Sequence, residues 1–444
     1  MINERIEFFD GYIKCNPYFL IIDIALIIHL LYSWYTNYLK TGTKITFWYL
    51  FMFKTFLINY LLLYPFNSSV KNFVSLDEFI FTADKFMDTA YLITTTGYIS
   101  VLIGRYLFKL FPPHKNQKIR IIQTFEKFIE EDIKNSFSTN MLIVISLLLF
   151  AFMLTFTLNT PYLFNPRSYF LGNKTIRPVY NFLLAVYPLA VIFVGLRSIQ
   201  YKKTIELIAT FFLISLSLFL GTRTAAIEPI LVLGFYYIYL NSKKISMLRI
   251  GLLILGLFVS AILLNNLRFS SNSFKFFDEI LYGNHFSDTR DFAFLLSFFN
   301  DGWLEGKSYL AGLMTFIPRQ YSEFRANWAF GLYCARLAQI YDPLFPGHRP
   351  GYFGEVFMNF GIIGVGFLGL WTGYIISLID KKVHTTITNT GNIIKAYSFT
   401  FSAYFVSVIN NSLLFAPFYT FITSILIITI IRHIVTYKSK IADE

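Results

Sequence analysis

Charge-poor apolar runs of about 20 residues, the length that spans a bilayer as a helix, recur along almost the whole chain. A chain inside lipid must become helical, because each backbone amide needs a hydrogen-bond partner and lipid offers none. Charged residues make up only 14% of the chain, whereas soluble domains carry about 25%. The sequence therefore predicts an all-α polytopic membrane protein and excludes a soluble enzyme.

We expect about eleven membrane spans. They lie near residues 18–35, 46–66, 87–108, 139–157, 178–196, 205–221, 224–240, 248–266, 354–379, 394–410 and 415–435. The first, sixth and seventh runs are short, so ten or twelve spans are alternatives. No internal repeat, low-complexity tract or flexible linker interrupts the chain, which predicts a single transmembrane domain over residues 1–444.

Loop charge predicts the orientation of the spans. Segment 104–138 carries seven Lys and Arg residues, which is typical of a cytoplasmic loop. Counting outward from it places the N-terminus outside and the C-terminus inside. Segment 267–353, between the eighth and ninth spans, is then a large outer loop. Its two amphipathic pieces, 292–299 and 309–317, are too short to span and are expected to form interfacial or re-entrant helices.

The two sides differ in the kind of basic residue they carry. The cytoplasmic segments hold 16 Lys and 5 Arg, whereas the outer segments hold 10 Arg and 6 Lys. A guanidinium presents a planar fork of donors that matches phosphate oxygens in pairs. The outer arginines therefore indicate a phosphate or pyrophosphate site; the alternative is that several of them pair with loop carboxylates. They are Arg5, Arg167, Arg177, Arg223, Arg268, Arg290, Arg319, Arg325, Arg336 and Arg349.

Three of these arginines lie at predicted turns or helix ends. Arg223 follows Gly221 where a helical hairpin turns at the outer surface. It either binds an anion or is an ordinary arginine whose side chain extends to the aqueous surface. Arg290 belongs to an Asp-Thr-Arg-Asp run that begins the first amphipathic piece, where helix amides are free to bind anions; an exposed capping sequence is the alternative. Arg319 ends the second amphipathic piece.

A Pro- and Gly-rich turn at 346–351 precedes the ninth span and carries His348 and Arg349. Glu355 and Asn359 follow, one helical turn apart. A carboxylate at a dehydrated helix start is a candidate general base, and so is the nearby histidine. The alternatives are that Glu355 only stabilises the helix dipole and that His348 is an ordinary loop histidine.

Two ions lie inside predicted spans, Asp23 in the first and Lys54 in the second. Intramembrane ions are usually paired or functional, so we expect a structural pair, with a proton relay as the alternative. The sequence lacks a P-loop, a Rossmann fingerprint, metal-ligand spacing and a GxSxG elbow; neither a cofactor nor a metal is expected. The net charge of +12 fits loop bias and anionic lipid groups rather than nucleic acid.

In layout and motifs the chain resembles the Wzy-type O-antigen or capsule repeat-unit polymerases, including the enterobacterial common antigen branch. The shared layout is many spans, a large outer loop before the last few, and a short basic tail. The shared motifs are Gly-Thr-Arg at 221–223, Thr-Arg-Asp at 289–291, Phe-Ile-Pro-Arg at 316–319, and Gly-Glu at 354–355 with Asn-Phe-Gly at 359–361. The resemblance implies a metal-independent GT-C-like glycosyltransferase of the bacterial inner membrane, with its active site facing the periplasm.

The resemblance also implies substrates and roles. Donor and acceptor would be undecaprenyl-pyrophosphate-linked oligosaccharides, and a chain-length regulator would be a further partner. Glu355 or His348 would accept the proton of the acceptor hydroxyl. Four arginines would bind the pyrophosphate: Arg223, Arg290, Arg319 and Arg349. Four further residues would contact the glycan: Tyr309, Tyr321, Trp328 and Asn359, of which Asn359 would also orient Glu355.

Three other functions remain open at this point. An O-antigen ligase would share the outer loop and the lipid-linked donor. A flippase or transporter is favoured by the intramembrane ions, although the sequence shows neither the internal repeats nor the broken helices typical of transporters. A non-catalytic partner in an envelope-polysaccharide complex is the third.

Overall fold

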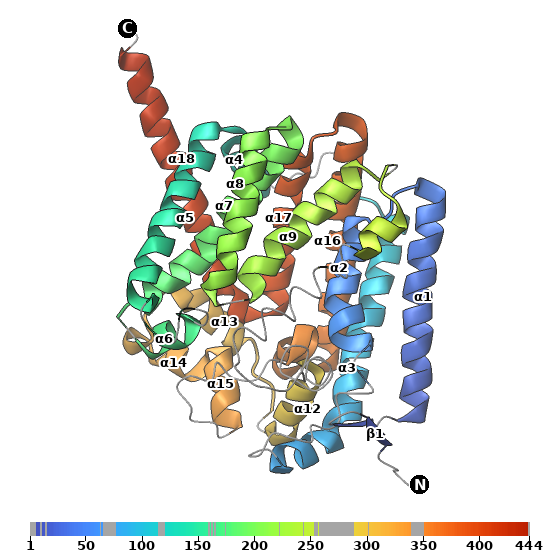
Figure 1. The fold of residues 1–444 in the computed structure, drawn as a ribbon. Coiled ribbons are helices and arrows are strands. Elements are labelled where there is room, and N and C mark those ends of the chain that lie inside the picture. Colours follow the sequence, from blue (N-terminus) through green and yellow to red (C-terminus); the bar gives the residue numbers. More distant parts are fainter. Residues whose placement is uncertain are drawn as a thin grey trace. The chain divides into compact units, whose positions relative to one another are not determined.

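The computed structural model describes most of the chain as helices (Figure 1). The described residues are 6–8, 11–13, 16–62, 64, 77–113, 120–158, 160, 163, 166–173, 175–221, 223–242, 244–252, 256, 288–300, 302–338 and 350–442. A short antiparallel hairpin of β1 (Ile6–Phe8) and β2 (Gly11–Ile13) precedes the first helix. The expectation of a helical membrane protein holds for the described residues apart from this hairpin.

Six described helices are long and apolar enough to cross a membrane. They are α1 (Pro17–Thr41), Lys85–Leu110 of α3 (Asp77–Leu110), α5 (Ser136–Thr157), α7 (Arg177–Tyr201), α16 (Gly351–Thr390), and Ser412–Ile434, most of which lies in α18 (Phe415–Ala442). Three shorter apolar helices cover Phe47–Ile58, Thr204–Ser217 and Ile227–Leu240. The expected run at 248–266 lies mostly outside the described residues, so the count of about eleven stays a prediction.

The chain divides into two compact units, each built from separate stretches of sequence. Unit 1 comprises Met1–His114, Ser273–Asp380 and Ala403–Ala416. Unit 2 comprises Lys115–Asn272, Lys381–Ser402 and Pro417–Glu444. Because α16, α17 (Ile393–Asn410) and α18 each have residues in both units, neither unit is one continuous segment.

The membrane helices of unit 1 pack through glycines. After α1, α2 (Phe47–Met52) continues directly into a π-helix over Phe53–Leu61. A Cβ at Gly97 of α3 would collide with the ring of Phe353 in α16, and a Cβ at Gly373 of α16 would collide with the backbone carbonyl of Val101. Small residues let two helix backbones touch, which is the usual way that helices associate in lipid.

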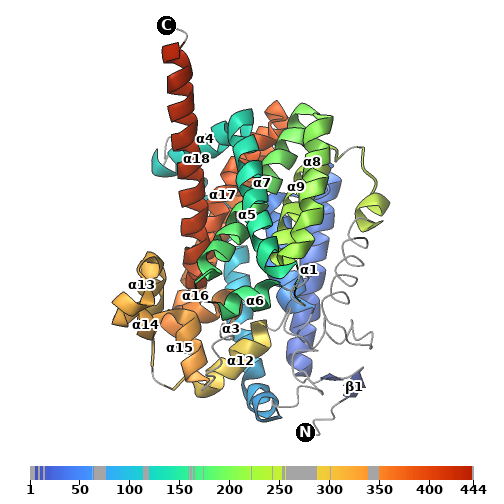
Figure 2. The same ribbon diagram turned by 60° about the vertical axis from the view of Figure 1, so that its left-hand side comes forward.

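Segment 267–353, which the sequence predicts to be an outer loop and which is called the outer-loop segment below, forms short helices in its described residues. They are α12 (Asp288–Phe298), α13 (Lys307–Leu313), two 3₁₀ turns at Met314–Phe316 and Arg319–Tyr321, α14 (Glu323–Trp328) and α15 (Phe330–Leu337). Helices were expected at 292–299 and 309–317, and α12 and α13 lie there. In both ribbon views these helices gather at the end of unit 1 where α1, α3 and α16 begin (Figures 1 and 2). The predicted topology places the starts of these three helices and the segment 267–353 on the same side of the membrane, as the structure has them. Which side of the membrane that is stays a prediction.

Unit 2 is built around α7. This helix packs against α5, α8 (Thr204–Ser217) and α9 (Arg223–Leu240), and its residues 189–198 are buried. Gly195 of α7 allows a close approach, because a Cβ there would collide with Leu233 of α9. The amphipathic helix α4 (Arg120–Lys134), the short α6 (Pro166–Gly172) and a 3₁₀ turn at Leu218–Leu220 complete the described elements of this unit.

Candidate functional site

A break in α16 organises the candidate site in unit 1. Gly361 has φ 64° and ψ −164°, which separates the first ten residues of α16 from the rest. The positive φ suits glycine because it has no Cβ. The freed carbonyls of Met358 and Asn359 accept hydrogen bonds from the amides of Leu304 (2.9 Å) and Glu305 (3.2 Å). The outer-loop segment is therefore fastened to the broken helix.

Glu355 lies at the centre of a buried polar network on the first part of α16. Its side chain is only 1% exposed. One carboxylate oxygen, Oε1, accepts from the Ser308 hydroxyl at 2.6 Å, and the other, Oε2, accepts from the Ser412 amide at 2.7 Å. Both oxygens thus act as acceptors, as they do in an ionised carboxylate. Glu355 joins α16 to α13, which carries Ser308, and to the 3₁₀ turn Ser412–Leu414.

Asn359 is the second buried member of this network. Its amide nitrogen donates to the Ser308 hydroxyl at 2.9 Å and to the Glu355 carbonyl at 2.8 Å. Its amide oxygen accepts from the Gly306 amide at 3.0 Å. Asn359 therefore lies beside Glu355 and reaches its carboxylate through Ser308, a residue that the sequence analysis did not single out.

Tyr309 borders the same carboxylate. Its ring stacks on Phe360, with centroids 5.8 Å apart and an interplanar angle of 15°. Burial raises the pKa of the Tyr309 hydroxyl well above its ordinary value, and the negative charge of Glu355 raises that pKa further. The hydroxyl is therefore neutral and able to donate. It is buried and has no hydrogen-bond partner among the described residues.

Asn410 closes the other side of the network at the end of α17. Its side chain is fully buried, and its amide nitrogen lies within hydrogen-bond distance of three acceptors, to two of which its two N–H groups can donate at once: the Tyr352 hydroxyl (3.2 Å), the Thr372 hydroxyl (3.0 Å) and the Val406 carbonyl (2.9 Å). Its amide oxygen is buried and accepts no hydrogen bond from the described part of the chain. Asn410 thus joins the end of α17 to Tyr352 and Thr372 of α16.

The four arginines expected to bind pyrophosphate have different surroundings. Arg290 is 4% exposed within α12; burial lowers its pKa, and the charge of Asp291 opposes that effect. Arg319 is exposed in the 3₁₀ turn before α14. Arg223 begins α9 in unit 2, but its side chain lies outside the described part of the structure, as does the whole of Arg349. A shared arginine site stays a prediction, and so does a catalytic role of His348, which also lies outside the described residues.

The two other candidate sugar-contacting aromatic residues also differ. Tyr321 is 75% exposed. The ring of Trp328 already stacks on Tyr333, with centroids 5.9 Å apart, and the Lys307 ammonium lies 5.0 Å from the Trp328 ring centroid. Of the two, Tyr321 is the better placed to contact a ligand.

The expected ion pair between Asp23 and Lys54 is wrong. Asp23 is buried in α1 and accepts a hydrogen bond from the Tyr91 hydroxyl at 3.2 Å. The side chain of Lys54 is exposed on the π-helix. Lys54 lies on the exposed face of the π-helix, away from Asp23. The Asp23 carboxyl group therefore accepts its hydrogen bond from a tyrosine of α3 and not from a lysine.

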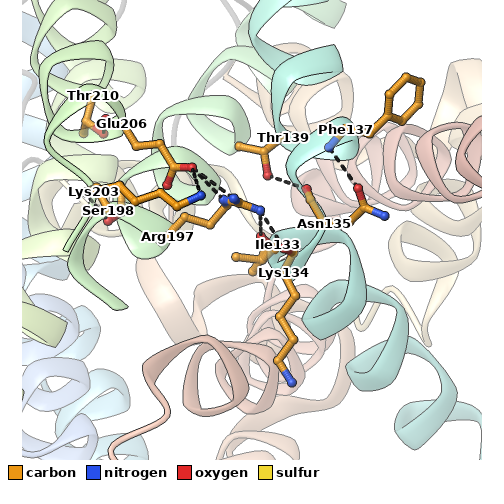
Figure 3. A network of polar contacts seen from close by, with 11 residues as sticks. Ile133, Lys134, Asn135, Phe137, Thr139, Arg197, Ser198, Lys203, Glu206 and Thr210 are labelled. Carbon is orange, nitrogen blue, oxygen red and sulfur yellow. Dashed lines mark hydrogen bonds and ion pairs between the residues drawn. The ribbon is translucent and has the colours of Figure 1, made fainter. Parts of the chain in front are cut away.

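A separate polar network in unit 2 has a structural role (Figure 3). Arg197, 3% exposed near the end of α7, donates to the carbonyls of Ile133 (3.4 Å) and Lys134 (2.6 Å). Its Nε and Nη2 donate to Glu206 Oε1 at 3.1 and 3.0 Å. A cation over the last carbonyls of a helix satisfies groups that lack partners within the helix. Arg197 therefore fastens the end of α4 to the start of α8.

No family model, curated protein or solved structure matches this chain. The resemblance stated from its layout and motifs is therefore not supported by these comparisons, and it stays a prediction. Among the described residues, no group of three or more His, Cys, Asp and Glu side chains could hold a metal ion.

Proposed function

We propose that this protein polymerises undecaprenyl-pyrophosphate-linked oligosaccharide repeat units into O-antigen or capsular polysaccharide at the outer leaflet of the bacterial inner membrane. The observation that carries the proposal is the buried Glu355 carboxylate, which is held by Ser308 and the Ser412 amide beside the helix break at Gly361. Burying a carboxylate is costly, and irregular backbone in a membrane helix is retained mainly where it lines a protein-enclosed site.

In the proposed reaction Glu355 is the general base. It takes the proton from a hydroxyl of the acceptor sugar, and the oxygen of that hydroxyl bonds to the anomeric carbon of the donor. The bond from that carbon to the pyrophosphate oxygen breaks, and undecaprenyl pyrophosphate leaves with the electron pair. Ser308 donates to Glu355 Oε1 and so helps to hold the carboxylate in place. Asn359 holds Ser308 and so positions the base.

The predicted arginines stabilise the leaving group in this scheme. Negative charge develops on the pyrophosphate as its bond to the sugar breaks, and guanidinium donors oppose that charge. Loss of one such contact costs about 3 kcal/mol at the transition state, as with other preorganised donors. Of the four arginines in this scheme, Arg319 is the one that the structure describes as exposed, in a 3₁₀ turn of unit 1.

Transport is the second candidate, because the break in α16 favours it. The sequence predicts no broken helix, and that prediction is wrong: Gly361 interrupts α16 within an apolar run long enough to be a single span. Broken helices with freed carbonyls build the substrate sites of many transporters. An O-antigen ligase would use the same base and donor and differs only in its acceptor.

Purified protein in liposomes, supplied with lipid-linked repeat units and no ion gradient, tests the proposal. Glu355→Gln keeps the size of the side chain and removes the base, so elongation should fall about 10²- to 10⁴-fold. Glu305→Gln is the matched control, because the Glu305 side chain lies nearby and is 75% exposed. Elongation by Glu355→Gln at the wild-type rate would exclude Glu355 as the base.

A cell-based assay separates the polymerase from the ligase. A deletion strain of a polymerase makes lipopolysaccharide capped with single repeat units. A deletion strain of a ligase instead accumulates polymer that is still attached to the lipid carrier. Uptake that requires a gradient, with no elongation in the liposome assay, would favour transport.

A further inference from the structure

Among the buried polar atoms that have no hydrogen-bond partner in the described residues, two belong to sequence neighbours of the residues that bond Glu355: the hydroxyl of Tyr309, next to Ser308, and the side-chain oxygen of Asn410, two positions before Ser412. An unsatisfied buried polar group is unfavourable by about 1–3 kcal/mol, and proteins keep few of them. Two on the border of one site therefore need an explanation.

The contacts around Tyr309 and Asn410 place them on the same network. Tyr309 directly follows Ser308, whose hydroxyl donates to Glu355, and the charge of Glu355 raises the pKa of the Tyr309 hydroxyl. Tyr352 accepts a hydrogen bond from Asn410. The helix that carries Tyr309 also lies directly on the 3₁₀ turn after Asn410, because a Cβ at Gly312 would lie only 2.8 Å from that of Ser412.

The orientation of the Asn410 amide is fixed by its neighbours. A backbone carbonyl only accepts, so the group 2.9 Å from the Val406 carbonyl must be the amide nitrogen. The opposite atom is then the oxygen, which needs a donor. The neutral Tyr309 hydroxyl is a donor that needs an acceptor.

We infer that Tyr309 and Asn410 bind the hydroxyl-bearing end of the acceptor sugar beside Glu355. A sugar hydroxyl both donates and accepts, so neighbouring hydroxyls of one ring can donate to Asn410 and accept from Tyr309. The buried charge of Glu355 repels a phosphate, which favours a neutral ligand here. This inference rests on the proposed function and assigns the acceptor, not the pyrophosphate donor, to this pair.

The roles of the residues follow from the balance of the reaction. Hydrogen bonds to two flanking hydroxyls leave the third, reacting hydroxyl free to pass its proton to Glu355. Its oxygen forms the new bond to the donor sugar, and undecaprenyl pyrophosphate leaves as described above. Tyr309 and Asn410 exchange no proton and fix only which hydroxyl faces the base. They therefore determine acceptor affinity and linkage.

Tyr309→Phe tests the inference, because it removes the hydroxyl and keeps the ring stacked on Phe360. The probe is the free repeat-unit oligosaccharide released from its lipid, which carries the acceptor hydroxyl but no leaving group. With this acceptor, KM should rise about five- to tenfold, the loss expected for one hydrogen bond, while KM for the lipid-linked donor is unchanged. Tyr237→Phe is the control, because Tyr237 is half exposed in unit 2.

A binding measurement without turnover separates this inference from the proposed function. Trp303 lies against Gly361, so its fluorescence reports on oligosaccharide bound near the break. Wild type should bind the free oligosaccharide and Tyr309→Phe should bind it more weakly. Because the hydroxyl has no described partner, the variant should unfold at the wild-type temperature or above it. Asn410→Leu also removes the hydrogen bonds that the side-chain amide donates, so its folding is checked first by thermal unfolding; it should weaken binding too.

Three outcomes of these measurements separate a failure of the sugar site from a failure of the polymerase proposal. If wild type elongates but Tyr309→Phe binds and uses the oligosaccharide normally, the two atoms hold ordered water only and the inference is wrong. If wild type binds the oligosaccharide, with weaker binding by Tyr309→Phe, but never elongates, the sugar site stands and the polymerase proposal fails. If wild type neither elongates nor binds the oligosaccharide, both proposals are wrong.

Discussion

The side-chain amide of Asn359 donates to the Ser308 hydroxyl across 2.9 Å, and that hydroxyl in turn donates to Glu355. A serine of the predicted outer loop therefore connects two residues of one helix that are four positions apart. The hydroxyl acts as acceptor toward the amide and as donor toward the carboxylate, so both of its bonding roles are used.

Removing that hydroxyl should destabilise the protein. Ser308→Ala leaves an oxygen of Glu355 and an N–H of Asn359 without their partner, and should lower the free energy of unfolding by about 1–3 kcal/mol. Ser215→Ala is the control, because the exposed Ser215 hydroxyl only donates back to the Phe211 carbonyl of its own helix. Denaturant unfolding in detergent measures both, and equal effects would mean that the buried network contributes no stability.

The glycine at the helix break should tolerate no side chain. Gly361→Ala must hold alanine at φ 64° and ψ −164°, a conformation that costs about 1–3 kcal/mol for any residue with a Cβ, and the new Cβ would lie 3.1 Å from the Trp303 ring. Gly366→Ala in the same helix should instead stabilise the protein, because a Cβ there meets no atom closer than 3.9 Å. Alanine favours a helix over glycine by about 1 kcal/mol. The two variants should therefore shift the unfolding midpoint in opposite directions, and two shifts of the same sign would contradict this account.

The sequence predicts the helices of this protein better than it predicts the site. The run at 139–157 became α5 (Ser136–Thr157), because the length of an apolar run sets the length of the helix that buries it. The break at Gly361 was missed, because glycine is tolerated in membrane helices and hydropathy continues past it. At the break, carbonyls of α16 accept hydrogen bonds from the amides of Leu304 and Glu305, and no local sequence pattern predicts this pairing between distant segments.

Spacing explains which partners of Glu355 could be found. Asn359 is one helical turn away, so the sequence alone placed it beside Glu355. Ser308 and Ser412 lie 47 and 57 positions away along the chain and carry no recognisable motif. The wrong pairing of Asp23 with Lys54 has a related cause. A sequence shows which ions lie inside spans but not which face of a span meets which neighbour.

The Arg197 network should contribute stability without affecting catalysis. Arg197→Gln removes the charge that holds two carbonyls of α4 and Glu206, so unfolding should become easier by about 2–3 kcal/mol. Lys203→Gln is the matched control, because Lys203 approaches the same Glu206 at 3.5 Å from an exposed position, and such surface pairs contribute at most about 1 kcal/mol. Unfolding should separate the two variants, while elongation per folded molecule matches wild type in both. Loss of elongation in folded Arg197→Gln would assign Arg197 more than a structural role.

Cysteine labelling tests the predicted orientation. In a variant with Cys15 replaced by serine, the remaining Cys334 is fully buried and should not react, which provides the blank. Tyr321→Cys in that background should react in intact spheroplasts with a membrane-impermeant maleimide, because position 321 is 75% exposed in the outer loop. Lys203→Cys should react only after the membrane is permeabilised. The reverse pattern would place the Glu355 site on the cytoplasmic side and would remove the lipid-linked donor from its reach.

Asp23 distinguishes the polymerase from the transporter. Its carboxyl group is buried in α1 against the Tyr91 hydroxyl, and in a proton-coupled transporter a group in such a position carries the coupled proton. Asp23→Asn keeps an oxygen that accepts from Tyr91 and removes the titratable group. A polymerase should therefore elongate lipid-linked repeat units within about twofold of wild type with this variant, because no proton has to cross the membrane in glycosyl transfer. Parallel liposomes with an imposed proton gradient and labelled oligosaccharide outside measure uptake. Gradient-driven uptake by wild type that Asp23→Asn abolishes would show that the protein is a proton-coupled transporter instead.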